Sequence, residues 1–416
     1  MNYVNDRSKS LLFLVGANGS GKTYALNAAL NEHRDNGLLI TEDGVLVVPR
    51  QKNRVSIEYE TMYYYYKDEK ARGQIREPKE KETITEKAKN VIGYCDSIKK
   101  KIQQFKTKSK GQEKVANIMD IFTRCNLNNI EFVFFDEPEN YLDEEFLKVI
   151  ANLFHVLLVN GFVVRSATHN PRLLNLLRVN IEQIILLDNH KMFDVSLDEL
   201  NKMYFSSTKE IEKVRTLYQM EIDPVIQYKL NMHRHSLAFD SFVRQSLQNE
   251  DFYRCLFCKH IFIVEGESDI AALSCIKREF DTSTEIFNPN GKAFIPFFVQ
   301  LFRCLRKKVT VIIDDDRPNQ EEKNLSHPVA ITKVLEQQSS NSEITLVIHT
   351  PNMEDHYNID LDTIGRLLGM SNKVRSKKRG WLKYLAASVY FSDEGNRTRI
   401  RNHVLGVTKE ISFEFT

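Results

Sequence analysis

A glycine-rich stretch near the start of the chain has the residues and spacing of a phosphate-binding loop. Residues 16–23 read GANGSGKT, and they lie between an apolar run, 11–15, and a stretch with helical character, 24–33. Glycines let backbone N–H groups approach phosphate oxygens, and the N-terminus of a helix adds positive potential. Lys22 would reach the β and γ phosphates of a nucleotide, and Thr23 would bind Mg²⁺. A chance glycine turn is the alternative, and the flanking strand and helix argue against it. The residues expected to contact the nucleotide are Gly16, Asn18, Gly19, Ser20, Gly21, Lys22 and Thr23.

A second apolar run ends in two acidic residues. Residues 132–135 read FVFF, and Asp136 and Glu137 follow them. A buried strand would place Asp136 at its end to hold Mg²⁺, directly or through water, and Glu137 where a base orients an attacking water. The alternative is an acidic loop after a strand, which the complete phosphate loop upstream makes the weaker interpretation. The two segments together predict a nucleotide-hydrolysing lobe with Glu137 in a catalytic role.

These segments and three more resemble the ABC-type ATPase family, including its DNA-repair and SMC-like branch. Residues 109–112 (SKGQ) resemble a shortened family signature, 136–143 (DEPENYLD) resemble the extended Walker B motif and D-loop, and His169 resembles the catalytic switch histidine. The resemblance implies that two protomers sandwich ATP, with Ser109 and Gly111 facing the γ phosphate of the partner protomer. It therefore implies a homodimer or higher oligomer. No glutamine is assigned to the family's Q-loop.

Carboxylates also end two apolar runs in the second half of the chain. Glu265 ends the run IFIVE, and Asp314, Asp315 and Asp316 follow the run VTVII. Side chains alternate along a strand, so Asp314 and Asp316 would share one face while Asp315 points away. Strands of a parallel sheet end at the same crevice, which would bring Glu265, Asp314 and Asp316 together. Carboxylates so close call for a divalent cation, and oxygen ligands suit Mg²⁺ or Mn²⁺. A solvated strand end is the alternative.

This arrangement resembles the TOPRIM domain, which occurs in topoisomerases, primases and OLD-family nucleases. Glu265 matches the glutamate of that domain, and Asp314-x-Asp316 matches its acidic pair. Asp269 lies where several nuclease members carry another acid, and Glu354 would complete a second metal position. The resemblance implies that Glu265, Asp314 and Asp316 are catalytic and that all five carboxylates bind metal. Two metal ions held in this way would activate a water and stabilise the leaving oxygen of a phosphodiester.

Several weaker signals accompany the two sites. Residues 290–292 (NGK) resemble the small-residue turn between two TOPRIM motifs, and Lys292 or Arg317 would neutralise charge on a phosphate unless either is a surface residue. Basic residues between positions 371 and 402, interleaved with Trp381 and Tyr384, predict either a nucleic-acid track or a solvated helical face.

Two tentative binding motifs remain weak. Cys255, Cys258 and His260 lack the second ligand pair that would support zinc binding. The tyrosines at positions 63–66 are interpreted as packing residues rather than as a surface for base stacking.

Length and composition bound the architecture. The 416 residues carry 58 Lys+Arg against 56 Asp+Glu, and the net charge of +2 excludes a uniformly basic nucleic-acid binder. The 42% of hydrophobic residues excludes wholesale disorder, and the length predicts two or three domains. We expect an α/β protein with an ABC-type ATPase domain (1–205), in which residues 67–110 form a charged helical insertion. A helical connector (206–257), a TOPRIM domain (258–360) and a basic C-terminal segment (361–416) would follow.

The sequence gives no sign of a membrane segment or of secretion. No apolar run reaches the roughly 18 residues that a membrane helix requires, and the first ten residues lack the apolar run and cleavage site of a secretory signal. Six cysteines in a chain of this length fit a reducing compartment better than a disulfide framework. We therefore expect a cytoplasmic protein without membrane contact.

An ATPase lobe followed by a TOPRIM lobe resembles OLD-family nucleases and the ATPase and TOPRIM components of the PARIS phage-defence system. The resemblance predicts an ATP-regulated, metal-dependent nuclease that acts on DNA or on structured RNA such as tRNA, with an accessory defence protein as a further partner. The alternative is a sensor or clamp whose TOPRIM lobe only scaffolds a partner, and the intact carboxylates argue against it. A topoisomerase or primase would need further domains, for which the chain has little room.

Overall fold

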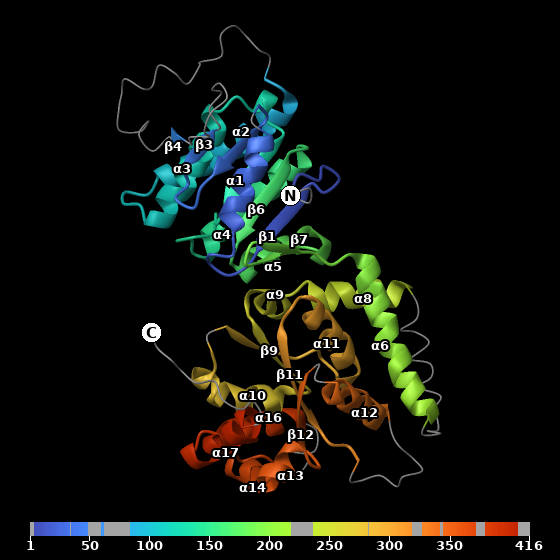
Figure 1. Cartoon of the computed structure of the whole chain (residues 1–416). Helices are drawn as coiled ribbons and strands as arrows, with labels where there is room; N and C mark the ends of the chain where they lie inside the picture. Colours follow the sequence, from blue (N-terminus) through green and yellow to red (C-terminus); the bar gives the residue numbers. More distant parts are fainter. Residues whose placement is uncertain are drawn as a thin grey trace, which may run out of the picture. The chain divides into compact units, whose positions relative to one another are not determined.

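The computed structural model divides the chain into two compact units, each built on its own sheet (Figure 1). It describes residues 4–33, 35–48, 60–61, 84–217, 236–281, 283–317, 327–341, 344–371 and 379–406. The first unit comprises Met1–Asp194 and Gln248–Leu256, and the second comprises Val195–Leu247 and Phe257–Thr416. Both are α/β units with parallel strands, which confirms the predicted fold class.

The sheet of the first unit has eight strands in the order β4-β3-β2-β5-β6-β1-β7-β8. β6 pairs in parallel with both β1 and β5, so the strands predicted to end at the phosphate loop and at the acidic pair end at one edge of the sheet. β1 and β5 are buried along their whole length, as a parallel strand covered on both faces requires. The strands are β1 (Leu11–Val15), β2 (Gly37–Ile40), β3 (Leu46–Val48), β4 (Glu60–Thr61), β5 (Phe132–Asp136), β6 (Val163–Thr168), β7 (Ile184–Asp188) and β8 (Lys191–Phe193).

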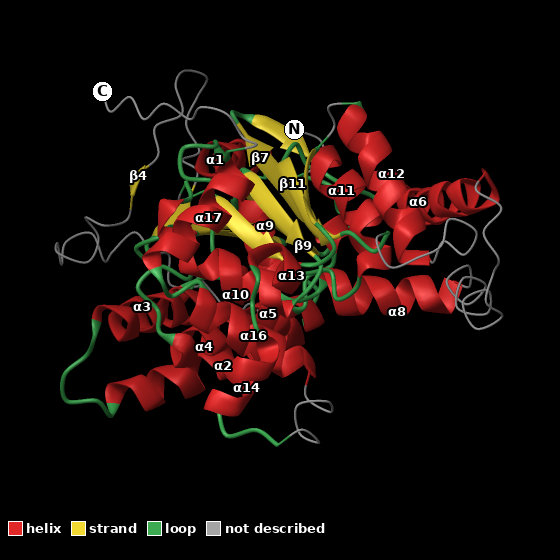
Figure 2. Cartoon of the chain, turned by 90° about the horizontal axis from the view of Figure 1, so that it is seen from below, coloured by secondary structure: helices red, strands yellow, loops and turns green. Residues whose placement is uncertain are grey.

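Helices flank this sheet (Figure 2). Residues at the start of two of these helices cap them. Thr85 caps α2 by accepting a hydrogen bond from the backbone N–H of Ala88, and Ser109 caps α3 in a reciprocal box with Gln112. Residues 84–110 of the predicted charged insertion thus contain a capped helix, whereas residues 67–83 lie outside the described residues. The helices are α1 (Lys22–Glu32), α2 (Glu86–Gln103), α3 (Lys110–Arg124), α4 (Glu144–Val159), α5 (Pro171–Leu177) and α9 (Glu250–Phe257), with short 3₁₀ turns η3 (Leu127–Asn129) and η4 (Ile181–Gln183).

A fully buried arginine ties the first residues of the chain to this sheet. Arg165 lies on β6 and donates hydrogen bonds to the backbone carbonyls of Val4, Asp6 and Val164. Its guanidinium carbon lies 5.8 Å from the ring centroid of Phe132. Burial lowers the pKa of Arg165 to about 10, which still leaves it charged at neutral pH. The carbonyls therefore compensate a cation that would otherwise be costly to bury.

The sheet of the second unit has four parallel strands in the order β10-β9-β11-β12. β9 and β11 are neighbours, so the acids that follow them lie at the same edge (Figure 1). The strands are β9 (His260–Val264), β10 (Thr284–Phe287), β11 (Lys308–Asp314) and β12 (Thr345–His349). The helices are α6 (Leu197–Leu217), α8 (Ser236–Leu247), α10 (Glu267–Cys275), α11 (Ile295–Cys304), α12 (His327–Ser340), α13 (Met353–Tyr357), α14 (Leu361–Leu367), α16 (Arg379–Tyr390) and α17 (Glu394–Leu405), with 3₁₀ turns η5 (Lys277–Glu279) and η6 (Lys292–Phe294).

This division differs from the predicted domain boundaries at two places. The predicted connector is split. α6 and α8 join the second unit, where Tyr204 and Phe242 make edge-to-face contacts with Phe297. α9 joins the first unit, where the Tyr253 hydroxyl donates to the Val179 carbonyl over 2.7 Å. The predicted C-terminal segment is not separate either. Its helices α16 and α17 pack on α10 through a shared apolar core of Ala272, Tyr357, Ala386, Phe391, Ile400 and Val404. Charged residues conceal the buried faces of these helices in the sequence.

No helix among the described residues combines the length and the apolar character that crossing a bilayer requires.

Replacing the buried arginine tests the anchoring of the N-terminal residues. We expect Arg165→Met to lower the free energy of unfolding by about 2–4 kcal/mol, because the carbonyls of Val4 and Asp6 lose their donor in a buried position. Urea denaturation of the whole chain measures this change. Arg172→Met, at an exposed arginine that pairs with Glu144, is the control and should change stability little. Equal stabilities of the two variants would contradict this role of Arg165.

Candidate nucleotide and metal sites

The loop between β1 and α1 has the backbone that phosphate binding needs. Gly19 and Gly21 have φ angles of 78° and 100°, a region that glycine enters without steric cost. A side chain at Gly16 would lie 2.4 Å from the carbonyl oxygen of Leu187, so this position also requires glycine. The loop leads directly into α1, whose first backbone N–H groups have no partners within the helix. Anions bind at such helix termini.

A cavity of about 850 Å³ joins this loop to the acidic pair on β5. It is large enough for a nucleotide, since ligand pockets typically measure about 300–1,000 Å³. Ser20 is buried and, with Gly16, shapes the loop from outside the lining. The cavity is lined by Asn18, Gly19, Gly21, Lys22 and Thr23 of the loop, Asp136 and Glu137 after β5, and Thr41, Glu42, Asp43 and Val45 after β2. The last four were not singled out from the sequence, although they follow the strand next to β5.

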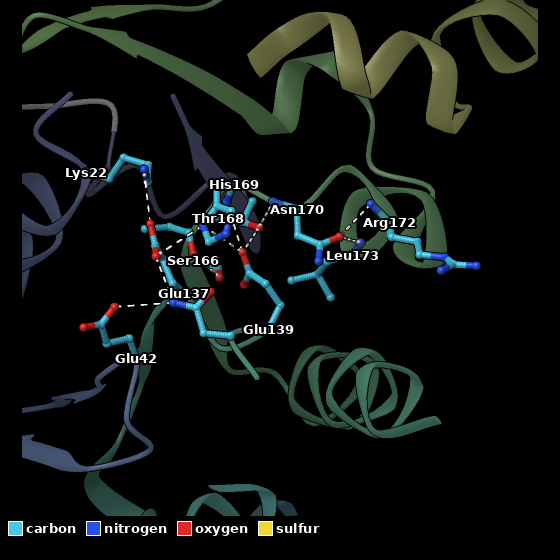
Figure 3. A network of polar contacts seen from close by, with 12 residues as sticks. Lys22, Glu42, Glu137, Glu139, Ser166, Thr168, His169, Asn170, Arg172 and Leu173 are labelled. Carbon is cyan, nitrogen blue, oxygen red and sulfur yellow. Dashed lines mark hydrogen bonds and ion pairs between the residues drawn. The ribbon is translucent and has the colours of Figure 1, made fainter. Parts of the chain in front are cut away.

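Asp136 and Glu137 have different surroundings at this cavity. Burial raises the pKa of Asp136, and a hydrogen bond from Thr23 opposes this rise. Glu137 has a positive φ of 46°, and its carboxylate lies 3.2 Å from Lys22 Nζ, 3.2 Å from His169 Nδ1 and 3.1 Å from Asn140 Nδ2 (Figure 3). Although burial raises its pKa, Asn140, His169 and Lys22 together hold the pKa of Glu137 below its usual value. The structure thus brings together the predicted lysine, glutamate and histidine, with Glu137 ionised.

Two buried residues that sequence reasoning missed hold this arrangement. Glu139 is 3% exposed and accepts hydrogen bonds from the Thr168 hydroxyl and from the backbone N–H of His169, so it fixes the histidine loop (Figure 3). Lys114, on α3, donates to the carbonyls of Glu137 and Asn140 over 3.0 and 3.1 Å. Burial lowers the pKa of Lys114 to about 8. Lys114 therefore stabilises the turn in which Glu137 has its left-handed conformation.

The signature-like residues lie on α3 but not on the cavity of their own protomer. Ser109 caps the helix, and a side chain at Gly111 would lie 2.6 Å from the carbonyl oxygen of Tyr141. Only glycine allows this close approach between α3 and the loop after β5. The predicted contact of Ser109 and Gly111 with a nucleotide of the partner protomer stays a prediction.

The second candidate site lies at the ends of β9 and β11. The structure brings Glu265 and Asp314 together, because Glu265 Oε2 accepts the backbone N–H of Asp314 over 3.1 Å. Lys292 Nζ lies 3.3 Å from Glu265 Oε2 and 2.6 Å from Asp316 Oδ2. Asp315 points away and binds Arg317 over 2.7 Å, as the alternation along the strand predicts. Glu265 and Asp316 therefore share the ammonium group of Lys292, and Glu265 also contacts the backbone of Asp314.

Asp269 and Glu354 extend this group of carboxylates. Burial, together with the charge of Asp314, raises the pKa of Asp269 well above its usual value. Burial, followed by the charges of Glu265 and Glu354, raises the pKa of Asp314 to about 7. Asp269 Oδ1 and Glu354 Oε1 are buried oxygens without a hydrogen-bond partner in the described part of the chain. Such oxygen donors, in mutual repulsion, fit Mg²⁺ or Mn²⁺.

The side chains are nevertheless not gathered around one point. Within the described ranges, no group of three or more His, Cys, Asp or Glu side chains is arranged to hold a metal ion. This applies equally to Cys255, Cys258 and His260. The ammonium group of Lys292 lies between Glu265 and Asp316.

Lysine and histidine side chains missed by sequence reasoning border these carboxylates. Lys383 on α16 lies 2.7 Å from Glu354 Oε2. His349 at the end of β12 is fully buried, with Nδ1 3.7 Å from Asp269 Oδ1 and 4.0 Å from Asp314 Oδ1. Neither follows an acidic motif, and only the fold brings them to the site.

The basic residues singled out from the sequence in the second half of the chain lie in different surroundings. Arg317, one candidate for phosphate, is held by Asp315 and Glu336 instead. Arg399 donates to the Tyr390 hydroxyl over 2.7 Å, and Arg401 pairs with Glu279 over 3.3 Å. Residues 372–378, which include Lys373, Arg375, Lys377 and Lys378, and the tyrosines at 63–66 lie outside the described residues. Trp381 and Tyr384 are exposed.

Comparison with known families identifies one segment of the chain. Residues 256–316 match the family described as "Overcoming lysogenization defect protein-like, TOPRIM domain". The matched segment runs from the end of α9 through β11 and contains Glu265, Asp269, Asp314 and Asp316, but it ends before Glu354. A search of curated proteins finds no match.

Two solved structures show weak similarity to the chain. One is a metal-chelate type ABC transporter in an inward-facing conformation, 14% identical, with a TM-score of 0.25, covering 47% of this chain and 78% of that one. The other is a bacterial Atm1-family ABC exporter with ATP bound, 14% identical, with a TM-score of 0.28, covering 46% of this chain and 35% of that one. Scores this low do not inform the fold or the function of this chain.

The raised pKa values predict how metal binding depends on pH. We expect the affinity for Mn²⁺ to fall as the pH drops below about 7, by roughly tenfold per pH unit, because the metal must then displace the proton of Asp314. Calorimetric titration of the whole chain between pH 6 and 8 measures this. Asp314→Asn should bind Mn²⁺ more weakly and lose part of the pH dependence. An affinity that is constant from pH 6 to 8 would rule out protonation at this site.

Proposed function

We propose that the chain is an ATP-regulated, divalent-metal-dependent nuclease whose TOPRIM domain hydrolyses phosphodiester bonds. The observation that carries this proposal is that Glu265 and Asp316 share Lys292, and that Glu265 contacts the backbone of Asp314, within the segment that matches an OLD-like TOPRIM domain. These three, with Asp269 and Glu354, would hold Mg²⁺ or Mn²⁺. A bound ion would activate a water and stabilise the leaving oxygen. Lys292 would contact the scissile phosphate.

The first unit would bind and hydrolyse ATP. Lys22 and the backbone of the loop would hold the phosphates, Thr23 and Asp136 the Mg²⁺, and Glu137 the attacking water, with His169 beside it. The position of Ser109 and Gly111 away from their own cavity supports a homodimer in which each protomer completes the partner's ATP site. In this proposal, ATP binding and hydrolysis at the dimer interface gate the nuclease.

The substrate would be DNA or structured RNA such as tRNA. The OLD-like match supports a nucleic-acid substrate, because its matched segment carries the acidic residues that phosphodiester hydrolysis needs. We further propose a role in bacterial defence against phage, in the cytoplasm and with an accessory defence protein as a partner.

Incubation of the purified chain with plasmid DNA and with tRNA tests the nuclease, with Mg²⁺ or Mn²⁺ and with or without ATP. We expect cleavage of at least one substrate, and a loss of at least 10²-fold in Asp314→Ala, since a metal ligand is removed. Asp355→Ala, at an exposed acid near the site, is the matched control. If Asp314→Ala cuts as well as the unaltered chain, the nuclease proposal fails. ATP turnover without cleavage of either substrate would favour the alternative, a sensor or clamp.

Removal of the buried lysine on α3 tests how the ATP site is built. We expect Lys114→Met to bind ATP normally but to hydrolyse it about 10²-fold more slowly, because Glu137 loses the cation that holds its turn. ATP binding and turnover are measured separately. Lys101→Met, at an exposed position of the helix α2, should hydrolyse ATP normally. Unchanged turnover in Lys114→Met would show that Glu137 needs no support from α3.

A further inference from the structure

Lys292 is held at the centre of the carboxylate group by three oxygen atoms. Its side chain begins η6, after Asn290 and Gly291, whose φ angles of 60° and 148° turn the chain sharply towards β11. Nζ lies 2.7 Å from the carbonyl oxygen of Asp314, 2.6 Å from Asp316 Oδ2 and 3.3 Å from Glu265 Oε2. The ammonium group donates hydrogen bonds to the first two of these oxygens and forms an ion pair with the third.

The burial of Lys292 makes these contacts obligatory. The residue is 7% exposed, and a lysine so buried is stable as a cation only when it is paired. Glu265 and Asp316 in turn lie on separate strand ends and would repel each other without a cation between them. The lysine therefore offsets part of the negative charge of the two carboxylates.

The ammonium group occupies the place that a metal ion bound by these carboxylates would need. A Mg²⁺ ion lies about 2.1 Å from each ligand oxygen, so an ion on Asp316 Oδ2 would lie less than about 5 Å from Nζ. The metal ion would also compete with Lys292 for Glu265 Oε2. A divalent ion bound to Glu265 Oε2 and Asp316 Oδ2 would therefore compete with Lys292 for the two oxygen atoms that it now contacts.

We propose that Lys292 is an internal counter-ion that occupies the metal position between Glu265 and Asp316 and that a divalent ion must displace. The inference rests on the metal site of the proposed function and adds a competitor to it. Displacement frees the ammonium group, still on its turn at the site edge, for the phosphate of a substrate. The cluster then exchanges one cation for another and is never left as unpaired acids.

Lys383 does not take this role, although it also contacts the cluster. Its Nζ lies 2.7 Å from Glu354 Oε2, and it reaches the site from α16, outside the segment that matches the TOPRIM family. Lys292 contacts both Glu265 and Asp316 and is the more deeply buried of the two lysines. Competition with a metal ion that bridges Glu265 and Asp316 is therefore specific to Lys292.

The test is the affinity of the whole chain for Mn²⁺, measured by electron paramagnetic resonance in the absence of nucleic acid and nucleotide. Leaving out the nucleotide removes the phosphate oxygens that would complete the metal site of the first unit in the proposed function. We expect Lys292→Met to bind Mn²⁺ roughly tenfold tighter than the unaltered chain, since the competing charge is gone. Lys292→Arg retains the charge and should not bind tighter. Lys277→Met, at an exposed lysine of the same unit that pairs with Glu285, is the control.

Thermal unfolding in the presence of a chelator gives a second measurement. Lys292→Met should unfold at a lower temperature than the unaltered chain, because its carboxylates have lost their cation, and Mn²⁺ should raise its unfolding temperature by a larger amount. A Lys292→Met protein that binds Mn²⁺ equally well or more weakly overturns the proposal.

The outcomes separate this inference from the nuclease proposal. If Lys292→Met binds Mn²⁺ more tightly while the unaltered chain cuts neither DNA nor tRNA, the counter-ion stands and the nuclease fails. If the unaltered chain is a nuclease but the affinity for Mn²⁺ does not rise in Lys292→Met, the reverse holds. If no variant binds Mn²⁺, the counter-ion proposal is lost together with the metal site.

Discussion

Charge neutralisation at the ends of buried parallel strands governs both candidate sites. β1 and β5 flank β6 in one sheet, and β9 and β11 are neighbours in the other. In each sheet, the residues at the ends of these strands therefore lie at the same edge. Acidic side chains delivered there are partly removed from water, and burial makes their charges costly. The lysines, histidines and backbone groups around each edge are arranged to offset that cost.

The two units meet this requirement in different ways. In the first, Lys22, His169 and Asn140 surround Glu137, and the pKa of this carboxyl is lowered. Its carboxylate is therefore ionised at neutral pH, and the neighbouring cavity has room for a nucleotide. In the second, acids outnumber their partners, and the pKa values of Asp314 and Asp269 are raised. That excess of acid is what a divalent ion would relieve, and Lys292 relieves part of it in the absence of metal.

Helices outside the sequence motifs contribute side chains to both sites. α3 contributes Lys114 to the turn after β5, and α16 contributes Lys383 to Glu354. α16 lies in a stretch that composition marks only as basic, yet it shares the apolar core of the second unit with α10. The segment that matches the TOPRIM family, residues 256–316, therefore contains the central acids, whereas His349, Glu354 and Lys383 lie beyond it.

The sequence by itself determined the parts of each site that are contiguous in the chain. Strand runs and glycine spacing predict the phosphate loop between β1 and α1 and the acids at the ends of β5, β9 and β11. Alternation along the strand predicts that Asp315 points away from Asp314 and Asp316. The α/β class follows from the same local patterns. The unit boundaries do not follow from these patterns. Charged residues mask the aromatic side chains that α6, α8 and α9 bury, and these helices belong to different units.

Only the tertiary structure decided which distant side chains meet these motifs. Lys114 lies 23 residues before Glu137, and Lys383 lies 29 residues after Glu354, and no local pattern marks either lysine as buried. Lys292 was recognised as part of a turn, but its position between Glu265 and Asp316 depends on how η6 meets the ends of β9 and β11. Periodicity reports which way a side chain points along its own element, whereas burial and pairing depend on the neighbours that folding brings to it.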